Sequence, residues 1–388
     1  MNNKLFESEN LISFRKHLHS MPELSGNELN TSKEIVKFIS KFFPDEIITN
    51  IGGYGLAFIF KGKFPGKTIM FRSELDALPI NEINDFDYKS VKKNISHKCG
   101  HDGHMAILAG VASSLLKNNA FSGKLILLFQ AAEETGTGAY NVINDKKFKL
   151  IQPDYVFALH NVPDFPLGSV ILNKSVFSSA SKGMIINLKG KTSHAAFPEH
   201  GKSPAFAMAN IINELKKNSK EDSLFNNFVL ITIIHAKLGE EAFGTTPGNA
   251  QIMATLRSFQ DKDMIKLTQT SEKIVRENAL KYSLDYSISY TEKFLATYNN
   301  SDCVEYIKNA ASQNNYQIIN KKEPFRWSED FSYYTKKYKG AMFGLGAGEE
   351  HPDLHNSNYD FPDELIKFGV NMFLSILKNF STTKLNKK

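Results

Sequence analysis

The amino-acid sequence predicts a two-domain α/β protein in which a compact βαββαβ unit interrupts a larger sheet domain. At 388 residues the chain is longer than one ordinary hydrophobic core supports. The first 180 residues alternate short apolar runs with helical patterns, which is typical of an α/β sheet. Residues 181–293 change to the order strand, helix, strand, strand, helix, strand. We therefore expect an inserted domain at 181–293, flanked by two halves of one domain at 1–180 and 294–388.

Continuous apolar runs predict the strands of the first half: Thr68–Phe71, Leu125–Phe129 and Tyr155–Leu159. Such runs suit strands that are buried on both faces. Apolar residues between Met105 and Leu116 recur at helical spacing, and Asp102 stands where an N-cap is expected. Ligands of open α/β sheets bind beyond the carboxyl ends of the strands, so chemistry is expected there.

The inserted unit and the last helix are predicted in the same way. The four strands of the inserted unit are expected at Met184–Lys189, Phe228–His235, Gln251–Ser258 and Tyr286–Lys293. Its helices are expected from Ser203-Pro204 to about Lys217, with proline at the first helical position, and over Asp261–Tyr282. An amphipathic helix is expected over Asp363–Phe380.

Composition excludes several classes of protein. The net charge of +6 is spread along the chain without the basic, aromatic-rich stripe of a nucleic-acid-binding protein. No apolar run has the roughly 20 residues of a membrane span, and Met1–Asn10 lacks the apolar core of a secretory segment. Two cysteines, Cys99 and Cys303, cannot build a disulfide framework. We therefore expect a cytoplasmic protein with neither nucleic acid nor membrane as partner.

The sequence Cys-Gly-His-Asp-Gly-His at Cys99–His104 is the main functional signal. Cys99 and His101 are two residues apart, so in an extended segment both side chains leave on the same side. Thiolate and imidazole are ligands of divalent transition metals. The alternative is a buried structural cysteine beside a helix-capping histidine, and the further donor clusters along the chain favour the metal site.

Those further donors follow buried strands or occupy polar loops. Glu133-Glu134 comes after the apolar run at Leu125–Phe129, and a Thr-Gly-Thr-Gly turn follows it. Adjacent carboxylates repel each other unless cations balance them, and one acting as metal ligand and the other as base resolves this conflict. His160 ends the run at Tyr155–Leu159, and His355 lies in a polar loop before the last helix. A lone histidine in either place is more often structural.

Three other residues are candidates for supporting roles. His194 and Arg257 lie in the inserted unit, and Arg257 closes a strand, where a guanidinium suits the binding of a substrate carboxylate. Asp76 follows the strand at Thr68–Phe71 and is a candidate for the acid that orients a ligating imidazole.

Taken together, these motifs resemble the M20 metallopeptidase family, in the amidohydrolase branch that includes N-acyl-amino-acid, hippurate and indoleacetyl-amino-acid hydrolases. The resemblance begins at His19-Ser20-Met21-Pro22-Glu23-Leu24-Ser25 and runs through Leu-Asp-Ala-Leu-Pro, Cys-Gly-His-Asp-Gly-His and the double glutamate. It continues through His-Ala-Ala-Phe-Pro-Glu and Ser328-Glu329-Asp330-Phe331-Ser332 to Leu354-His355-Asn356. It therefore covers nearly the whole chain.

The resemblance implies a fold and a site. The fold is an α/β/α catalytic domain like that of metal-dependent exopeptidases, interrupted by a βαββαβ lid that usually also forms the interface of a homodimer. The site is a pair of divalent ions, with zinc favoured and manganese, cobalt or nickel as alternatives. The implied ligands are Cys99, His101, Glu134, His160 and His355.

The resemblance also implies roles in hydrolysis of an N-acyl amino acid. Glu133 would be the general base, Arg257 would bind the substrate carboxylate, and His194 would stabilise the oxyanion, often in the active site of the partner subunit. In one place the chain departs from the commoner family pattern, which reads Asn-Val-Ile-Pro-Asp-x-Ala before the strand of the lid arginine. Gly244 and Gly248 stand where that pattern has Asn and Asp, so the substrate contacts of this segment are open. The rival functions are a dipeptidase or carboxypeptidase of the same family and a non-catalytic metal-binding scaffold.

Overall fold

A computed structural model describes residues 8–116, 120–219 and 224–382 of the chain. The predicted polar opening, Met1–Asn10, therefore lies mostly outside the described residues. The described residues form two compact units. Unit 1 contains the residues up to Phe177, Thr297–Glu323 and the residues from Asp330 onward. Unit 2 contains Ser178–Ala296 and the short segment Pro324–Glu329.

Unit 1 is built on a mixed eight-stranded sheet with the order β1-β2-β4-β3-β5-β16-β6-β15. The strands are β1 (Glu46–Ile51), β2 (Gly55–Lys61), β3 (Phe64–Glu74), β4 (Ser122–Gln130), β5 (Tyr155–Val162), β6 (Val170–Leu172), β15 (Ile318–Asn320) and β16 (Lys339–Gly346). The central strand β3 pairs in parallel with both β4 and β5, and β5 pairs in parallel with β16. The carboxyl ends of these four strands therefore meet at one edge of the sheet.

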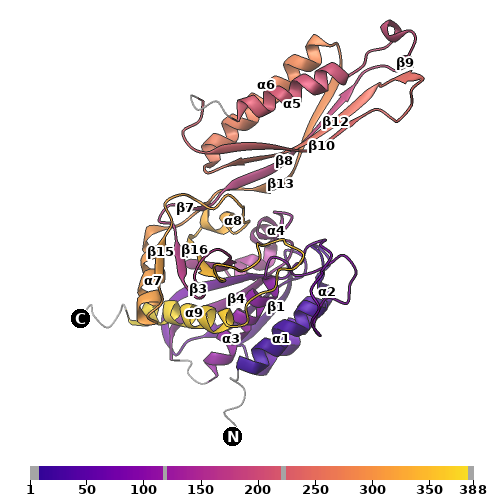
Figure 1. The fold of residues 1–388 in the computed structure, drawn as a ribbon. Helices are drawn as coiled ribbons and strands as arrows, with labels where there is room; N and C mark the ends of the chain where they lie inside the picture. The colour runs from indigo at the N-terminus through magenta and orange to yellow at the C-terminus, as the bar shows by residue number, and fades with distance from the viewer. Residues whose placement is uncertain (1–7, 117–119, 220–223, 383–388) are drawn as a thin grey trace. The chain divides into compact units, whose positions relative to one another are not determined.

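Helices cover the sheet of unit 1, as Figure 1 shows. One group packs together: α1 (Ser8–Ser20), α2 (Leu29–Ile39), α3 (His101–Leu115), α7 (Ser301–Gln313) and α9 (Leu365–Thr382). Helix α3 is buried nearly all round, because it is enclosed by α1, α2, α9 and strand β3. Two short helices, α4 (Gly138–Asn144) and α8 (Ser332–Thr335), contact each other and strands β4 and β16. A small two-stranded sheet joins β7 (Val176–Ser178) to β14 (Thr297–Tyr298).

Unit 2 is a four-stranded antiparallel sheet with two helices packed on it. Its elements are β8 (Ala180–Lys189), α5 (Ala205–Asn218), β10 (Val229–Leu238), β12 (Asn249–Ser258), α6 (Asp261–Lys281) and β13 (Asp285–Phe294). Buried and less buried residues alternate along β12, which is typical of a sheet with one face against helices. A separate short pair joins β9 (Ser193–His194) to β11 (Thr245–Thr246).

The α/β prediction is confirmed, and each predicted strand and helix lies within a few residues of its observed bounds. Two local predictions are wrong. Gly100, with a φ of 89°, is the N-cap of α3, and Asp102 lies in the first turn, where its carboxylate binds Arg15 and His19 instead of capping the helix. Pro204 is the N-cap of α5 and not its first helical residue. Among the described residues, none of the helices combines the length and apolar character that a membrane crossing requires.

Candidate metal centre and active site

The candidate site lies at the carboxyl edge of the central strands of unit 1. Strand β3 ends at Glu74, and Asp76 follows it. Strand β4 ends at Gln130, and Glu133 and Glu134 lie in the turn that follows. His160 lies inside β5, close to its carboxyl end. This edge of a parallel sheet is where open α/β proteins bind their ligands.

The structure brings the five predicted metal donors of unit 1 together. Potential ligand atoms of Cys99, His101 and His160 lie within 4.8 Å of one another, and so do those of Cys99, Glu134 and His355. Cys99 belongs to both groups, so the two groups are continuous. Cys99 Sγ lies 3.4 Å from His160 Nε2, and Glu134 carboxylate oxygens lie 3.8 Å from His101 Nε2 and 4.0 Å from His355 Nε2.

The chemistry of this cluster fits divalent metal ions. It combines a thiol, three imidazoles and a carboxylate, the donor types that zinc and similar ions prefer. His101 Nδ1 contacts the backbone carbonyl of Asp76 at 2.8 Å, which leaves Nε2 facing the cluster. That Nε2 atom is buried and has no hydrogen-bond partner among the described residues. Buried polar atoms are normally satisfied, so an absent partner at this atom is consistent with a ligand.

The electrostatics of the cluster also favour a cation. Burial and the nearby charge of Glu134 raise the pKa of the Cys99 thiol. Burial by itself lowers the pKa of His101, but the carboxylates of Asp76, Glu74 and Glu134 outweigh burial and raise it to about 10. The site thus attracts positive charge, which a bound metal supplies in place of protons.

Glu133 is buried beside the donor cluster. Its carboxylate belongs to a group with His101 and Glu134 whose potential ligand atoms lie within 4.8 Å of one another. Glu133 Oε1 accepts a hydrogen bond from the backbone N–H of Asp330 at 3.2 Å. The Glu133 carboxylate is thus held next to the donor set.

Asp76 lies against the His101 ring with both its backbone oxygen and its carboxylate. The imidazole Nδ1 contacts the backbone oxygen of Asp76, while the carboxylate Oδ1 lies 3.7 Å away. The other carboxylate oxygen accepts hydrogen bonds from Ser25 Oγ at 2.7 Å and from the backbone N–H of Glu134 at 2.9 Å. Asp76 therefore contacts the turn of the double glutamate as well as the imidazole.

A buried polar network behind the donors was missed by sequence reasoning. Arg72 pairs with both Glu74 and Asp330 in the interior of unit 1. His104 is bound at both ring nitrogens, by Glu74 at 2.7 Å and by Asn161 at 2.6 Å. Both nitrogens of His104 therefore have hydrogen-bond partners in the protein, whereas Nε2 of His101 has none among the described residues. An arginine within the buried strand β3 is the one sequence signal that points to such a network.

A second missed network lies at the start of α3. Arg15 and His19 from α1 both bind Asp102, at 3.2 and 2.9 Å. The fully buried Lys98 donates to Glu82 Oε1 at 2.6 Å, and its backbone oxygen accepts from the N–H of His355 at 2.8 Å. These contacts fix the segment that carries Cys99 and His101.

His194 and Arg257 both lie in unit 2. His194 is exposed on β9, and its Nδ1 accepts from the N–H of Ala196 at 3.0 Å. Arg257 Nη1 donates to the backbone oxygen of Arg326 at 3.0 Å and to Ser328 Oγ at 3.1 Å. Its guanidinium makes no ion pair with the described residues. Burial lowers the pKa of Arg257, which is consistent with a charge that lacks a carboxylate partner.

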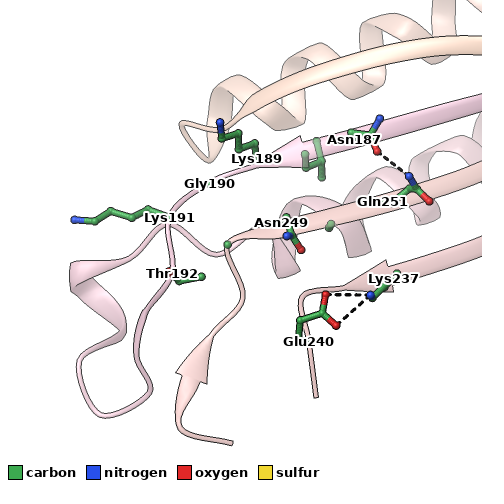
Figure 2. A pocket seen from close by; sticks show the side chains of 12 residues that line it. Asn187, Lys189, Gly190, Lys191, Thr192, Lys237, Glu240, Asn249 and Gln251 are labelled. Carbon is green, nitrogen blue, oxygen red and sulfur yellow. Dashed lines mark hydrogen bonds and ion pairs between the residues drawn. The ribbon is translucent and has the colours of Figure 1, made fainter. Parts of the chain in front are cut away.

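Unit 2 also has an open hollow of about 700 Å³ at one end of its sheet, shown in Figure 2. Gly248 and Thr192 are among its lining residues, and no predicted catalytic or metal-binding residue is. A Cβ atom on Gly248 would lie 2.7 Å from Thr192 Cγ2, whereas one on Gly244 meets nothing within 4 Å. The side chain that the commoner family pattern has at position 248 would therefore require the loop of Thr192 to move.

Comparison with known proteins gives consistent results. The family model described as peptidase family M20/M25/M40 matches residues 70–379. An N-acetyldiaminopimelate deacetylase of Priestia megaterium is 28% identical over 366 residues, which are 93% of this chain and 96% of the relative. The corresponding deacetylase of Bacillus subtilis is 27% identical, over 92% of this chain and 94% of the relative.

A solved structure has a similar fold. A dinuclear metal-binding peptidase of the M20 family from Bacillus subtilis aligns with a TM-score of 0.83 and 24% identity, over 98% of this chain and all of the other. The family model covers well over half of the chain. We conclude that the chain belongs to peptidase family M20/M25/M40, in its amidohydrolase branch, and is a metal-binding enzyme that hydrolyses amide C–N bonds.

Proposed function

We propose that this enzyme hydrolyses the amide bond of N-acyl amino acids with two divalent metal ions. The proposed ligands are Cys99, His101, Glu134, His160 and His355. The observation that carries the proposal is the convergence of these donors around one buried thiol, with Glu133 beside them. The names of the relatives add support, because N-acetyldiaminopimelate is an N-acylated amino acid.

The metals, zinc by preference, would supply positive charge that lowers the pKa of water and polarises the amide carbonyl. Glu133 takes a proton from the attacking water and later passes it to the leaving amine. Asp76 holds the Glu134 backbone and the His101 ring in place. His194 donates a hydrogen bond to the oxyanion, and Arg257 binds the substrate carboxylate. We also propose that unit 2 is a lid and forms the interface of a homodimer. A cytoplasmic location remains a prediction.

The test of this proposal combines a substrate panel with a variant of the base. Metal-reconstituted protein is assayed against N-acetyl and N-benzoyl amino acids and against dipeptides. We expect hydrolysis of acyl amino acids, and loss of it when a chelator removes the metals. Glu133→Gln should lower kcat by roughly 10²- to 10⁴-fold, the usual contribution of a general base, with bound metal near the wild-type amount.

The exposed Glu305 on α7, changed to Gln, is the matched control and should keep wild-type turnover. Wild-type rates in Glu133→Gln would contradict the role of the base. Preference for dipeptides would favour the peptidase alternative. A fully metal-loaded protein without hydrolysis of any panel member would favour a scaffold.

A further inference from the structure

The backbone just before Glu133 is held in an unfavourable conformation. Ala132 has a φ of 55°, in the left-handed region that residues with a Cβ atom rarely adopt. Such conformations persist only where the surrounding structure holds them, and they cluster at functional sites. The direction in which Glu133 leaves the backbone depends on this residue, so the groups that hold Ala132 are of interest.

One group that holds Ala132 is a buried carboxyl from the start of α2. Glu28 Oε1 accepts the backbone N–H of Ala132 at 2.8 Å and that of Gly26 at 2.9 Å. Glu28 is fully buried. On the other side of the residue, the oxygen of Ala132 accepts the N–H of Gly138 at 2.9 Å. The peptide groups on both sides of Ala132 are therefore fixed.

The residue after Glu133 is fixed in the same manner. Asp76 accepts the N–H of Glu134, and Ser25 donates to the same oxygen of Asp76. Glu133 thus lies between two residues whose backbone N–H groups bind carboxyls from other elements. The segment that contains Ser25 and Glu28 is the support of this turn.

Resting on the proposed function, we propose that Glu28 is a positioning residue that orients the general base Glu133 by binding the backbone of Ala132. Burial and the charge of Asp76 raise the pKa of Glu28 to about 7. Glu28 acts through the side-chain oxygen that accepts the N–H of Ala132, and glutamine retains such an oxygen. Glu28→Gln should therefore keep the turn, whereas Glu28→Ala removes the acceptor.

Glu23 provides a matched control, because its carboxylate binds the backbone at the start of the same helix, α2. It is also a buried carboxylate, and it accepts the backbone N–H groups of Asn30 and Thr31 at 2.8 Å each. Among the described residues, its carboxylate makes no hydrogen bond to Ala132. Glu23→Ala should lower thermal stability without a change in the direction of Glu133.

The experiment measures kcat, KM and metal content of zinc-loaded wild type, Glu28→Ala, Glu28→Gln and Glu23→Ala with an N-acetyl amino acid that the wild type hydrolyses. Glu28→Ala should lose about 10- to 100-fold in kcat, as expected when a supporting contact is removed. Its KM and metal content should stay within about threefold of wild type, and Glu28→Gln and Glu23→Ala should keep kcat within the same range. Hydrogen exchange at the Ala132 amide should accelerate only in Glu28→Ala.

Three results would overturn the role of Glu28: wild-type kcat in Glu28→Ala, equal losses in Glu28→Ala and Glu28→Gln, or an equal loss in Glu23→Ala. A wild-type protein that hydrolyses no acyl amino acid would instead overturn the proposed function. The exchange rate at Ala132, which needs no substrate, separates the two failures.

Discussion

Replacement of Asp330 by asparagine tests the buried network that supports the candidate site. Asp330 is fully buried in unit 1, and its carboxylate binds the Arg72 guanidinium. The same carboxylate accepts from Gln130 Nε2 at 2.9 Å and from the backbone N–H of Ala139 at 2.8 Å. All these partners are donors. The amide nitrogen of asparagine would therefore face at least one other donor.

The cost follows from the loss of charge in the interior. Removing one partner of a buried ion pair typically costs about 3–5 kcal/mol, because the other charge stays buried without compensation. Here Arg72 keeps its second partner, Glu74, which reduces the uncompensated charge. We therefore expect Asp330→Asn to lower the free energy of unfolding by about 3 kcal/mol, at the lower end of that range.

Thermal and urea unfolding, followed by circular dichroism, measure this loss. A matched control is Asp302→Asn, because Asp302 pairs with Lys339 at 3.0 Å on the surface. Exposed pairs contribute roughly 0–1 kcal/mol, so the control should unfold almost as the wild type does. A loss below about 1 kcal/mol for Asp330→Asn would refute the conclusion that this carboxylate compensates a buried charge.

Two further predictions concern pH and the loop of unit 2. Burial opposes protonation of His19, but Asp102 and Glu82 outweigh it and raise its pKa to about 9 from an ordinary 6.5. Protonated His19 therefore contributes up to about 3 kcal/mol to the free energy of unfolding. This contribution is complete below pH 6.5 and is lost as pH rises to about 9. Urea unfolding across this pH range should show that the free energy of unfolding declines less in His19→Gln than in the wild type. An equal decline in the wild type and in His19→Gln would contradict the raised pKa of His19. Gly248→Asp should lower the melting temperature because its Cβ would contact Thr192, whereas Gly244→Asn has free space. A thermal-shift assay compares the two variants. Equal melting temperatures for Gly248→Asp and Gly244→Asn would contradict this prediction, because the loop would then accommodate both side chains.

The elements of the fold could be predicted because their signals are local. Strands β3, β4 and β5 are continuous apolar runs, and α6 was expected within one residue of its observed end. The short pair β9 and β11 was not expected, because two-residue strands carry no periodic signal. The prediction that Asp102 caps α3 is wrong because a cap is predicted from neighbours in sequence, whereas the partners of Asp102, Arg15 and His19, come from another helix.

The sequence by itself determined the type of chemistry, because thiol, imidazole and carboxylate groups are recognisable as metal donors wherever they occur. It also determined that Glu133, Glu134 and His160 lie at the ends of buried strands, which directs them to the carboxyl edge of the sheet. Only the tertiary structure decided that His104 is bound at both nitrogens while Nε2 of His101 faces the donor cluster. Only the tertiary structure placed Glu28 against Ala132, 104 positions away in the chain. The physical reason is that such contacts depend on how distant segments pack, and no local pattern encodes that packing.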